Sequence, residues 1–172
     1  FTRLPNADPV LGVEMASTGE VACYGSDIND AFLKSMVASG FKIPKKNVLI
    51  SINKVYREYL LESLRKLKDY NIFATPTTSV FLTEHNITNT KLSYEEVFEH
   101  INNNKVELII NIPSNVDTNE TAITNGFKIR RASINSGVPL ITDIKLTILT
   151  ISSLNYIKEH GFTYKSWNKY LN

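Results

Sequence analysis

The chain of 172 residues is poor in cysteine, glycine and proline, and it contains no long apolar run. Its one cysteine, Cys23, rules out an internal disulfide bond and a metal cage built from thiolates. The 7 glycines and 6 prolines are too few for a collagen-like or low-complexity chain. No apolar stretch approaches the roughly 20 residues that a helix needs to cross a bilayer. We therefore expect a globular chain in a reducing compartment, without a membrane partner.

An excess of one charge is also missing, because 19 Lys and Arg residues stand against 17 Asp and Glu residues. A protein that binds the nucleic-acid backbone needs a clustered basic face, and the longest basic clusters here are the pairs Lys45-Lys46 and Arg130-Arg131. We expect no nucleic-acid partner. The sequence begins at Phe1 without a leader-like segment, and we expect it to be part of a larger protein.

From residue 47 onward, short β-branched runs alternate with stretches of helical periodicity. We expect strands at residues 48–52, 71–74, 88–92, 106–112 and 138–142. We expect helices near residues 56–67, 76–83, 94–103, 126–135 and 144–159. This alternation predicts an α/β fold, a three-layer parallel sheet flanked by helices. The loops after the strands should carry the function, because the carboxyl ends of parallel strands meet at one edge.

The first 45 residues have a different texture, with turn residues and no long amphipathic stretch. One helix is expected there, from the Ser26-Asp27 cap to about Ser39, where Gly40 closes it. We therefore divide the chain near residue 45, into a tail of residues 1–45 and a main domain of residues 46–172.

The clearest candidate site follows the second expected strand, at Thr75-Pro76-Thr77-Thr78-Ser79. Four hydroxyl groups gather there within five residues, at the start of a helix. Free amides and the dipole of a helix N-terminus attract an anion, and threonine hydroxyls add donors. In the alternative reading, Thr75 or Thr77 is simply the N-cap and Pro76 stands in the first turn. The residues alone leave both readings open.

Several other polar side chains have both a functional and a structural reading. Asn111 ends a strongly apolar strand, where its amide can face a ligand or satisfy a turn. Arg130 and Arg131 could together meet a phosphate, although most such arginines on a helix are only solvated. Tyr94 is either a core aromatic residue or a platform for a base. The sequence lacks the common phosphate-loop, nucleophile-elbow and paired-cysteine motifs, so no catalytic or metal-binding residue is predicted.

Residues 7–22, Ala-Asp-Pro-Val-Leu-Gly-Val-Glu-Met-Ala-Ser-Thr-Gly-Glu-Val-Ala, closely resemble the carboxyl end of the second synthetase half of carbamoyl phosphate synthetase. Residues 31–34 and 40–47 continue this resemblance, and the rest of the chain is similar to the carboxyl-terminal regulatory domain of that enzyme. The resemblance implies a methylglyoxal-synthase-like fold, preceded in residues 1–45 by the tail of an ATP-grasp synthetase domain. It also implies a regulatory domain, not itself an enzyme, within a ligase that uses ATP and Mg. This domain would need no cofactor, and its partners would be a small-molecule effector and the synthetase domains of the same polypeptide.

The same resemblance assigns the site. Thr75 and Thr78 match the effector-binding threonines of the family's Ala-Thr-x-x-Thr loop, and Asn111 matches its asparagine. Bacterial members place a phosphate-binding lysine where this chain has Tyr56, so Lys54 or Arg57, one or two positions away, would supply the charge instead. Phosphates would lie against the threonine loop, and a base or ribose would contact the tyrosine and the asparagine. The full set of expected effector-binding residues is Lys54, Arg57, Thr75, Thr77, Thr78, Ser79, Tyr94, Asn111, Arg130 and Arg131.

The expected effectors are a uridine nucleotide and a phosphorylated ribose of the pyrimidine pathway. Urea-cycle synthetases, which N-acetylglutamate activates, carry a tryptophan where this chain has Tyr94 and asparagines where it has Ser114 and Gly126. Multifunctional pyrimidine proteins of the CAD type are similar to this chain at residues 43–47, 126–131 and 139–145. We therefore expect a cytoplasmic, glutamine-dependent synthetase of pyrimidine synthesis, inhibited by UTP and activated by phosphoribosyl pyrophosphate (PRPP).

Three alternatives stay open. The first is an N-acetylglutamate-binding domain of a mitochondrial, ammonia-dependent urea-cycle synthetase. The second is an assembly module that binds neighbouring domains and no small molecule. The third is methylglyoxal synthase itself, whose chemistry needs a carboxylate base in a Gly-Gly-Asp turn. The corresponding region of this chain reads Leu92-Ser93-Tyr94-Glu95-Glu96 and has no such turn.

Overall fold

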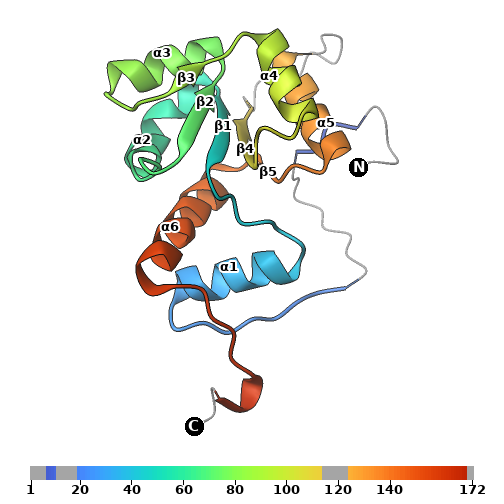
Figure 1. Cartoon of the computed structure of the whole chain (residues 1–172), viewed down its shortest axis with the longest axis vertical. Helices are drawn as coiled ribbons and strands as arrows, with labels where there is room; N and C mark the ends of the chain where they lie inside the picture. The colour runs from blue at the N-terminus through green and yellow to red at the C-terminus, as the bar shows by residue number, and fades with distance from the viewer. Residues whose placement is uncertain (1–6, 11–18, 114–123, 170–172) are drawn as a thin grey trace.

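The computed structural model describes residues 7–10, 19–113 and 124–169, and within them five strands form one parallel sheet (Figure 1). Their order across the sheet is β3-β2-β1-β4-β5, with all neighbours parallel. The strands are β1 (Asn47–Ile52), β2 (Asn71–Ala74), β3 (Thr90–Lys91), β4 (Leu108–Ile112) and β5 (Leu140–Ile141). The parallel sheet expected from the sequence is thereby confirmed.

Helices follow the strands at nearly the expected positions. The α-helices are α1 (Ile28–Ala38), α2 (Arg57–Arg65), α3 (Pro76–Glu84), α4 (Tyr94–Asn102), α5 (Asn125–Ser136) and α6 (Ile144–His160). Two short 3₁₀ helices, η1 (Lys54–Tyr56) and η2 (Trp167–Lys169), complete the described part. The expected strand at residues 138–142 was too long, since only β5 pairs with β4. None of the helices in the described ranges combines the length and apolar character of a membrane-spanning helix.

The core lies in two layers because side chains alternate along the strands. On one face of the sheet, Ile50 joins Leu60 of α2 and Ile151 of α6 in a large apolar cluster. On the other face, Leu49 joins Ile101 of α4 and Ile129 of α5. The sheet is therefore the middle of three layers. This arrangement brings the loops after β1, β2 and β4 to one edge, with helix N-termini beside them.

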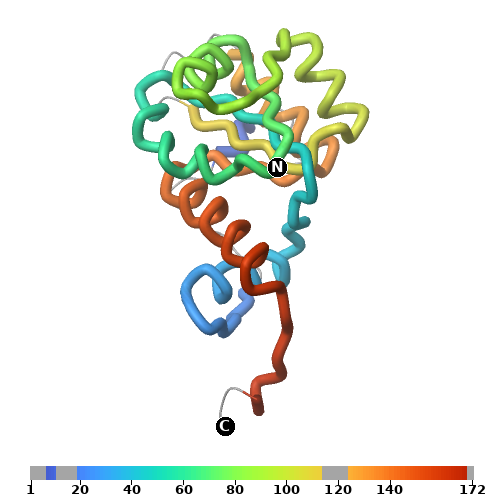
Figure 2. The backbone as a smooth tube through the Cα atoms, turned by 60° about the vertical axis from the view of Figure 1, so that its left-hand side comes forward, coloured from blue at the N-terminus to red at the C-terminus, as the bar shows by residue number. Residues whose placement is uncertain are grey.

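Helix α1 packs against α6, which runs out from the sheet to meet it (Figure 2). Leu33 of α1 is fully buried in the same cluster as Leu154 of α6. As expected, Asp27 caps the helix by accepting the N–H of Asp30 at 2.9 Å, and Gly40 follows its end with a positive φ of 95°. The domain boundary near residue 45 stays a prediction.

Glu107 ties the connector after α1 to the sheet. Its Oε2 accepts the backbone N–H groups of Lys45, Lys46 and Asn47 at 3.1, 2.6 and 2.9 Å. Partial burial by itself raises the pKa of Glu107, but the three N–H donors outweigh this effect and hold the pKa below its usual value. The carboxylate therefore stabilises the fold as an anion.

Replacing Glu107 with glutamine should lower the free energy of unfolding at pH 7 by about 1–2 kcal/mol, because a neutral amide accepts these N–H groups less strongly. A lowered folded-state pKa means that the stabilisation is complete above the unfolded pKa of roughly 4.3 and is lost as the pH falls through the folded value. In urea unfolding across pH 3–7, the free energy of unfolding should fall more steeply toward low pH for the natural chain than for E107Q. The control E99Q, at an exposed position of α4, should behave like the natural chain. Equal acid slopes for all three would contradict this role of Glu107.

Candidate anion-binding site

A row of polar side chains crosses the carboxyl edge of the sheet. Ser51 at the end of β1 lies in register with Asn111 near the end of β4. Thr75 follows β2 directly, and its N–H donates to the Ile50 carbonyl at 3.2 Å, which continues the pairing with β1. Neighbouring strands are roughly 4.8 Å apart, so the three side chains are close neighbours on one face. Thr75 and Asn111 are each only 2% exposed.

The threonine hydroxyls of the loop after β2 form a connected network. Thr75 Oγ1 donates to Thr78 Oγ1 at 3.1 Å and lies 3.4 Å from Ser51 Oγ. Thr78 Oγ1 accepts the N–H of Ile52 at 3.0 Å. Thr75 does stand at the N-cap position of α3 with Pro76 behind it, but its side chain makes no capping hydrogen bond. The simple N-cap reading is therefore wrong for the Thr75 hydroxyl, which faces the edge of the sheet instead.

Arg57 brings a positive charge to this loop. Its Nη2 donates to Thr77 Oγ1 at 2.8 Å, and its Nε donates to the Ile52 carbonyl at 3.0 Å. Burial lowers the pKa of the Arg57 guanidinium, while the charge of Glu84 and the phenol of Tyr94 raise it. An arginine stays protonated under such shifts, so the charge is fixed beside the N-terminus of α3. Lys54 lies in η1 and is exposed.

A second guanidinium lies at the other end of the row. Arg130 of α5 donates through Nη1 to Asn111 Oδ1 at 2.8 Å, and the residue is only 4% exposed. The reading of Arg130 as a merely solvated residue is therefore wrong. Gly126 makes room for it, because a Cβ at that position would lie 3.2 Å from Arg130 Nη1. Arg130 also forms an ion pair with Asp8 in the N-terminal part of the chain.

The remaining expected residues lie around this row or point away from it. Tyr94 is the first residue of α4 and packs, half-buried, against the apolar cluster under α4 and α5. Arg131 donates to the carbonyl of Ala7 at 3.3 Å. Ser79 donates its hydroxyl to Asn89 Oδ1 at 2.6 Å, and so it is not part of the threonine network. Ser114, which bears on the effector, lies outside the described residues.

The chemistry of the edge suits an anion. The guanidinium of Arg57 and the N-terminus of α3 supply positive charge, and the hydroxyls and the amide supply directed hydrogen bonds, while the charge of Arg130 is paired with Asp8. Glu96 accepts the N–H of Ser93 at 2.7 Å in a capping box that begins α4, and this hydrogen bond lowers the pKa of its carboxyl group. In the described ranges, no group of three or more His, Cys, Asp or Glu residues could hold a metal ion.

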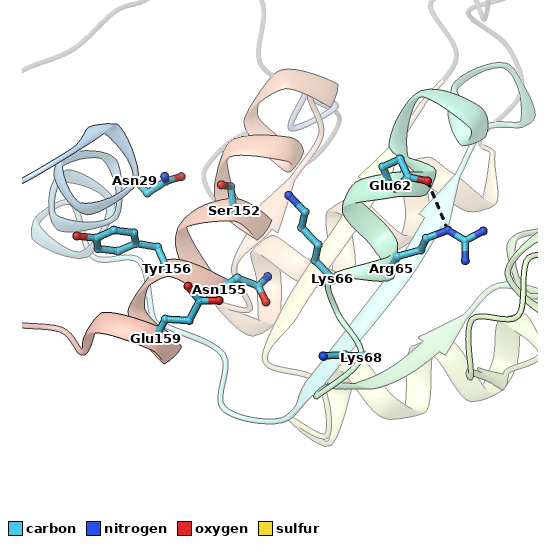
Figure 3. A pocket seen from close by; sticks show the side chains of 9 residues that line it. All are labelled: Asn29, Glu62, Arg65, Lys66, Lys68, Ser152, Asn155, Tyr156 and Glu159. Carbon is cyan, nitrogen blue, oxygen red and sulfur yellow. Dashed lines mark ion pairs between the residues drawn. The ribbon is translucent and has the colours of Figure 1, made fainter.

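Two other hollows of the surface lie away from this row. A groove of about 540 Å³ lies between α2 and α6, where Lys66 extends toward Ser152 and Asn155 of α6 (Figure 3). A second hollow of about 560 Å³ lies at the amino end of β2, beside residues 86–90. Neither includes a residue that the sequence assigned to the site.

Fold and site together define a class of protein: a three-layer α/β domain that is suited to hold an anionic small molecule at the carboxyl edge of its sheet. Comparison with known families agrees, since residues 59–142 match the family model described as the MGS-like domain. The chain therefore carries a domain of the MGS-like family.

Known proteins similar to the chain are much longer than it is. It is 43% identical over 175 residues to the multifunctional protein URA2 of Saccharomyces cerevisiae, across 90% of this chain and 8% of that protein. It is 36% identical over 178 residues to the multifunctional protein CAD of Squalus acanthias, across 91% of this chain and 8% of that protein. It is 38% identical over 161 residues to the mitochondrial carbamoyl-phosphate synthase (ammonia) of Homo sapiens, across 87% of this chain and 10% of that protein. The chain thus spans a tenth or less of these three relatives.

Proposed function

We propose that this chain is the allosteric regulatory domain of a carbamoyl phosphate synthetase of pyrimidine synthesis, and that it binds UTP as inhibitor and PRPP as activator. The observation that carries the proposal is the pair of guanidiniums, Arg57 and Arg130, that flank the row of Thr75, Ser51 and Asn111. Guanidiniums match phosphate oxygens in charge and geometry, and both effectors carry diphosphate or longer groups. The similarity to multifunctional proteins at 36–44% identity supports the pathway.

The two effectors would share the phosphate contacts and differ in the rest. Phosphates would lie between the threonine loop and Arg57, and the ribose or base would reach Asn111 and Tyr94. An effector shifts the state of the parent enzyme only by its differential affinity for two states, typically about 1–3 kcal/mol. The parent would be a cytoplasmic, glutamine-hydrolysing ligase that uses ATP and Mg in its synthetase domains, and the domain proposed here would carry out no chemistry itself.

The second candidate is a sensor of N-acetylglutamate in an ammonia-dependent synthetase. The 38% identity to the human enzyme of that kind favours it. The same two arginines would then face carboxylates. Tyr94 and Gly126 weigh against it, because the resemblance places a tryptophan and an asparagine at these positions in urea-cycle members.

Thermal unfolding of the chain with UTP, PRPP and N-acetylglutamate, followed by calorimetric titration, separates these candidates. A ligand present at 100 times its dissociation constant adds about 2.7 kcal/mol to the free energy of unfolding, which raises the melting temperature measurably. We expect UTP and PRPP to stabilise the chain and N-acetylglutamate to have no effect. Stabilisation by N-acetylglutamate alone would overturn the pyrimidine proposal. No response to any of the three would favour the assembly module.

A further inference from the structure

The described N-terminal segment, residues 7–10, lies against α5 at the edge of the site (Figure 1). The guanidinium of Arg130 holds both oxygens of the Asp8 carboxylate, with Nε donating to Oδ1 at 2.6 Å and Nη2 donating to Oδ2. Arg131 donates to the carbonyl of Ala7, and Pro9 is buried. Three consecutive residues thus anchor the segment on the helix.

The same guanidinium serves the candidate site. Its Nη1 donates to Asn111 Oδ1 at 2.8 Å, and Asn111 is the register neighbour of Ser51. An effector phosphate that reaches Arg130 would therefore meet the Asp8 carboxylate on the same group. Two anions that share one buried guanidinium repel each other and compete for its N–H donors.

Arg130 and Asp8 are buried to different extents. The side chain of Arg130 is 5% exposed, whereas that of Asp8 is 38% exposed. Arg130 is built into the fold by Asn111 and by the space over Gly126. The Asp8 carboxylate, in contrast, already lies partly in water. The carboxylate is therefore the partner that can leave.

We propose that Asp8 is a resident anion that competes with the effector phosphate for Arg130, so that effector binding releases residues 7–10 from α5. This inference rests on the proposed function, because it needs an anionic effector at this edge. Residues 7–10 belong to the part expected to come from the synthetase side. Replacement of the Asp8 carboxylate by the effector phosphate on Arg130 would therefore couple the effector site to the synthetase side.

Calorimetric titration of the whole chain with UTP and with inorganic pyrophosphate tests the competition. Asp8→Asn should bind both probes roughly tenfold or more tightly than the natural chain, because a larger fraction of the sites then has Arg130 free. The matched control is Asp69→Asn, which removes the same charge from an exposed ion pair with Lys158 at 3.2 Å. Its affinity for both probes should equal that of the natural chain.

Amide hydrogen exchange supplies a second readout, because UTP would not change it if the ion pair between Asp8 and Arg130 were purely structural. In the natural chain, UTP should increase the amide exchange of the N-terminal peptide that contains residues 7–10. Equal or weaker binding by Asp8→Asn, or exchange that UTP leaves unchanged, would overturn the competition while the proposed function stands. If neither the natural chain nor Asp8→Asn binds UTP, PRPP or pyrophosphate, the proposed function fails and the competition fails with it.

Discussion

Replacing Arg57 with methionine is expected to weaken UTP binding by about 10- to 100-fold, the loss of a charge-assisted hydrogen bond of roughly 1.5–3 kcal/mol. Arg57 is the cation that the structure fixes beside the N-terminus of α3, through Thr77 and the Ile52 carbonyl. Methionine keeps an apolar stem over the ring of Phe81, so the helix should stay folded. Calorimetric titration with UTP measures the loss, and circular dichroism checks the fold.

Two matched variants make this result specific. Lys54→Met removes the other candidate for the family's phosphate-binding lysine, and it should cost much less affinity, because Lys54 is exposed. Arg65→Met removes an exposed arginine from the same helix, where it pairs with Glu62 at 3.5 Å, and it should leave UTP binding unchanged. A larger loss in Lys54→Met than in Arg57→Met would show that Lys54 is the phosphate partner instead.

The second large effect is expected at Leu33, in the part of the chain that we assign to the synthetase tail. Leu33 of α1 is fully buried, and it belongs to the same apolar cluster as Ile151 and Leu154 of α6. Leu33→Ala should therefore lower the free energy of unfolding by about 2–5 kcal/mol, the ordinary cost of a large-to-small change in a core. Urea unfolding followed by far-UV circular dichroism and by tyrosine fluorescence should give coincident transitions, since α1 and the sheet share one core.

The exposed Ile28 of the same helix provides the control. It is 70% exposed, and Ile28→Ala should change the free energy of unfolding by less than about 0.5 kcal/mol. If Leu33→Ala were as mild as Ile28→Ala, or if the two probes separated, α1 would unfold independently of the sheet. The boundary near residue 45 would then separate two parts of the chain that unfold independently.

Most of the fold could be predicted because its signals are local. Most of the expected strands contain a short apolar run, and each helix has a periodic face or a capping residue such as Asp27. The predicted bounds were least accurate for the shortest strands. β5 is two residues long and follows Pro139, which has no N–H to pair, so the local pattern at residues 138–142 overstated it.

The site was only partly predictable because its contacts are not local. The threonine loop stood out through its density of hydroxyls, and the resemblance supplied Asn111. A local pattern could not choose between Lys54 and Arg57, because side chains three positions apart in a helical segment can point in different directions. The burial of Arg130 depends on Asn111 and on Asp8, which is 122 residues away in the sequence. Ser51 was missed, although a polar residue near the end of an apolar strand was a usable signal.

The central claim is that a phosphorylated effector binds at the carboxyl edge of the sheet. Nuclear magnetic resonance of the ¹⁵N-labelled chain, titrated with UTP, tests it most directly. The account predicts that the amide signals of Thr77, Thr78 and Asn111 and the side-chain Nε–H of Arg57 shift in a saturable manner. It predicts no shift for residues 86–90 at the opposite edge. Saturable shifts confined to those residues, or to the groove between α2 and α6, would contradict the account.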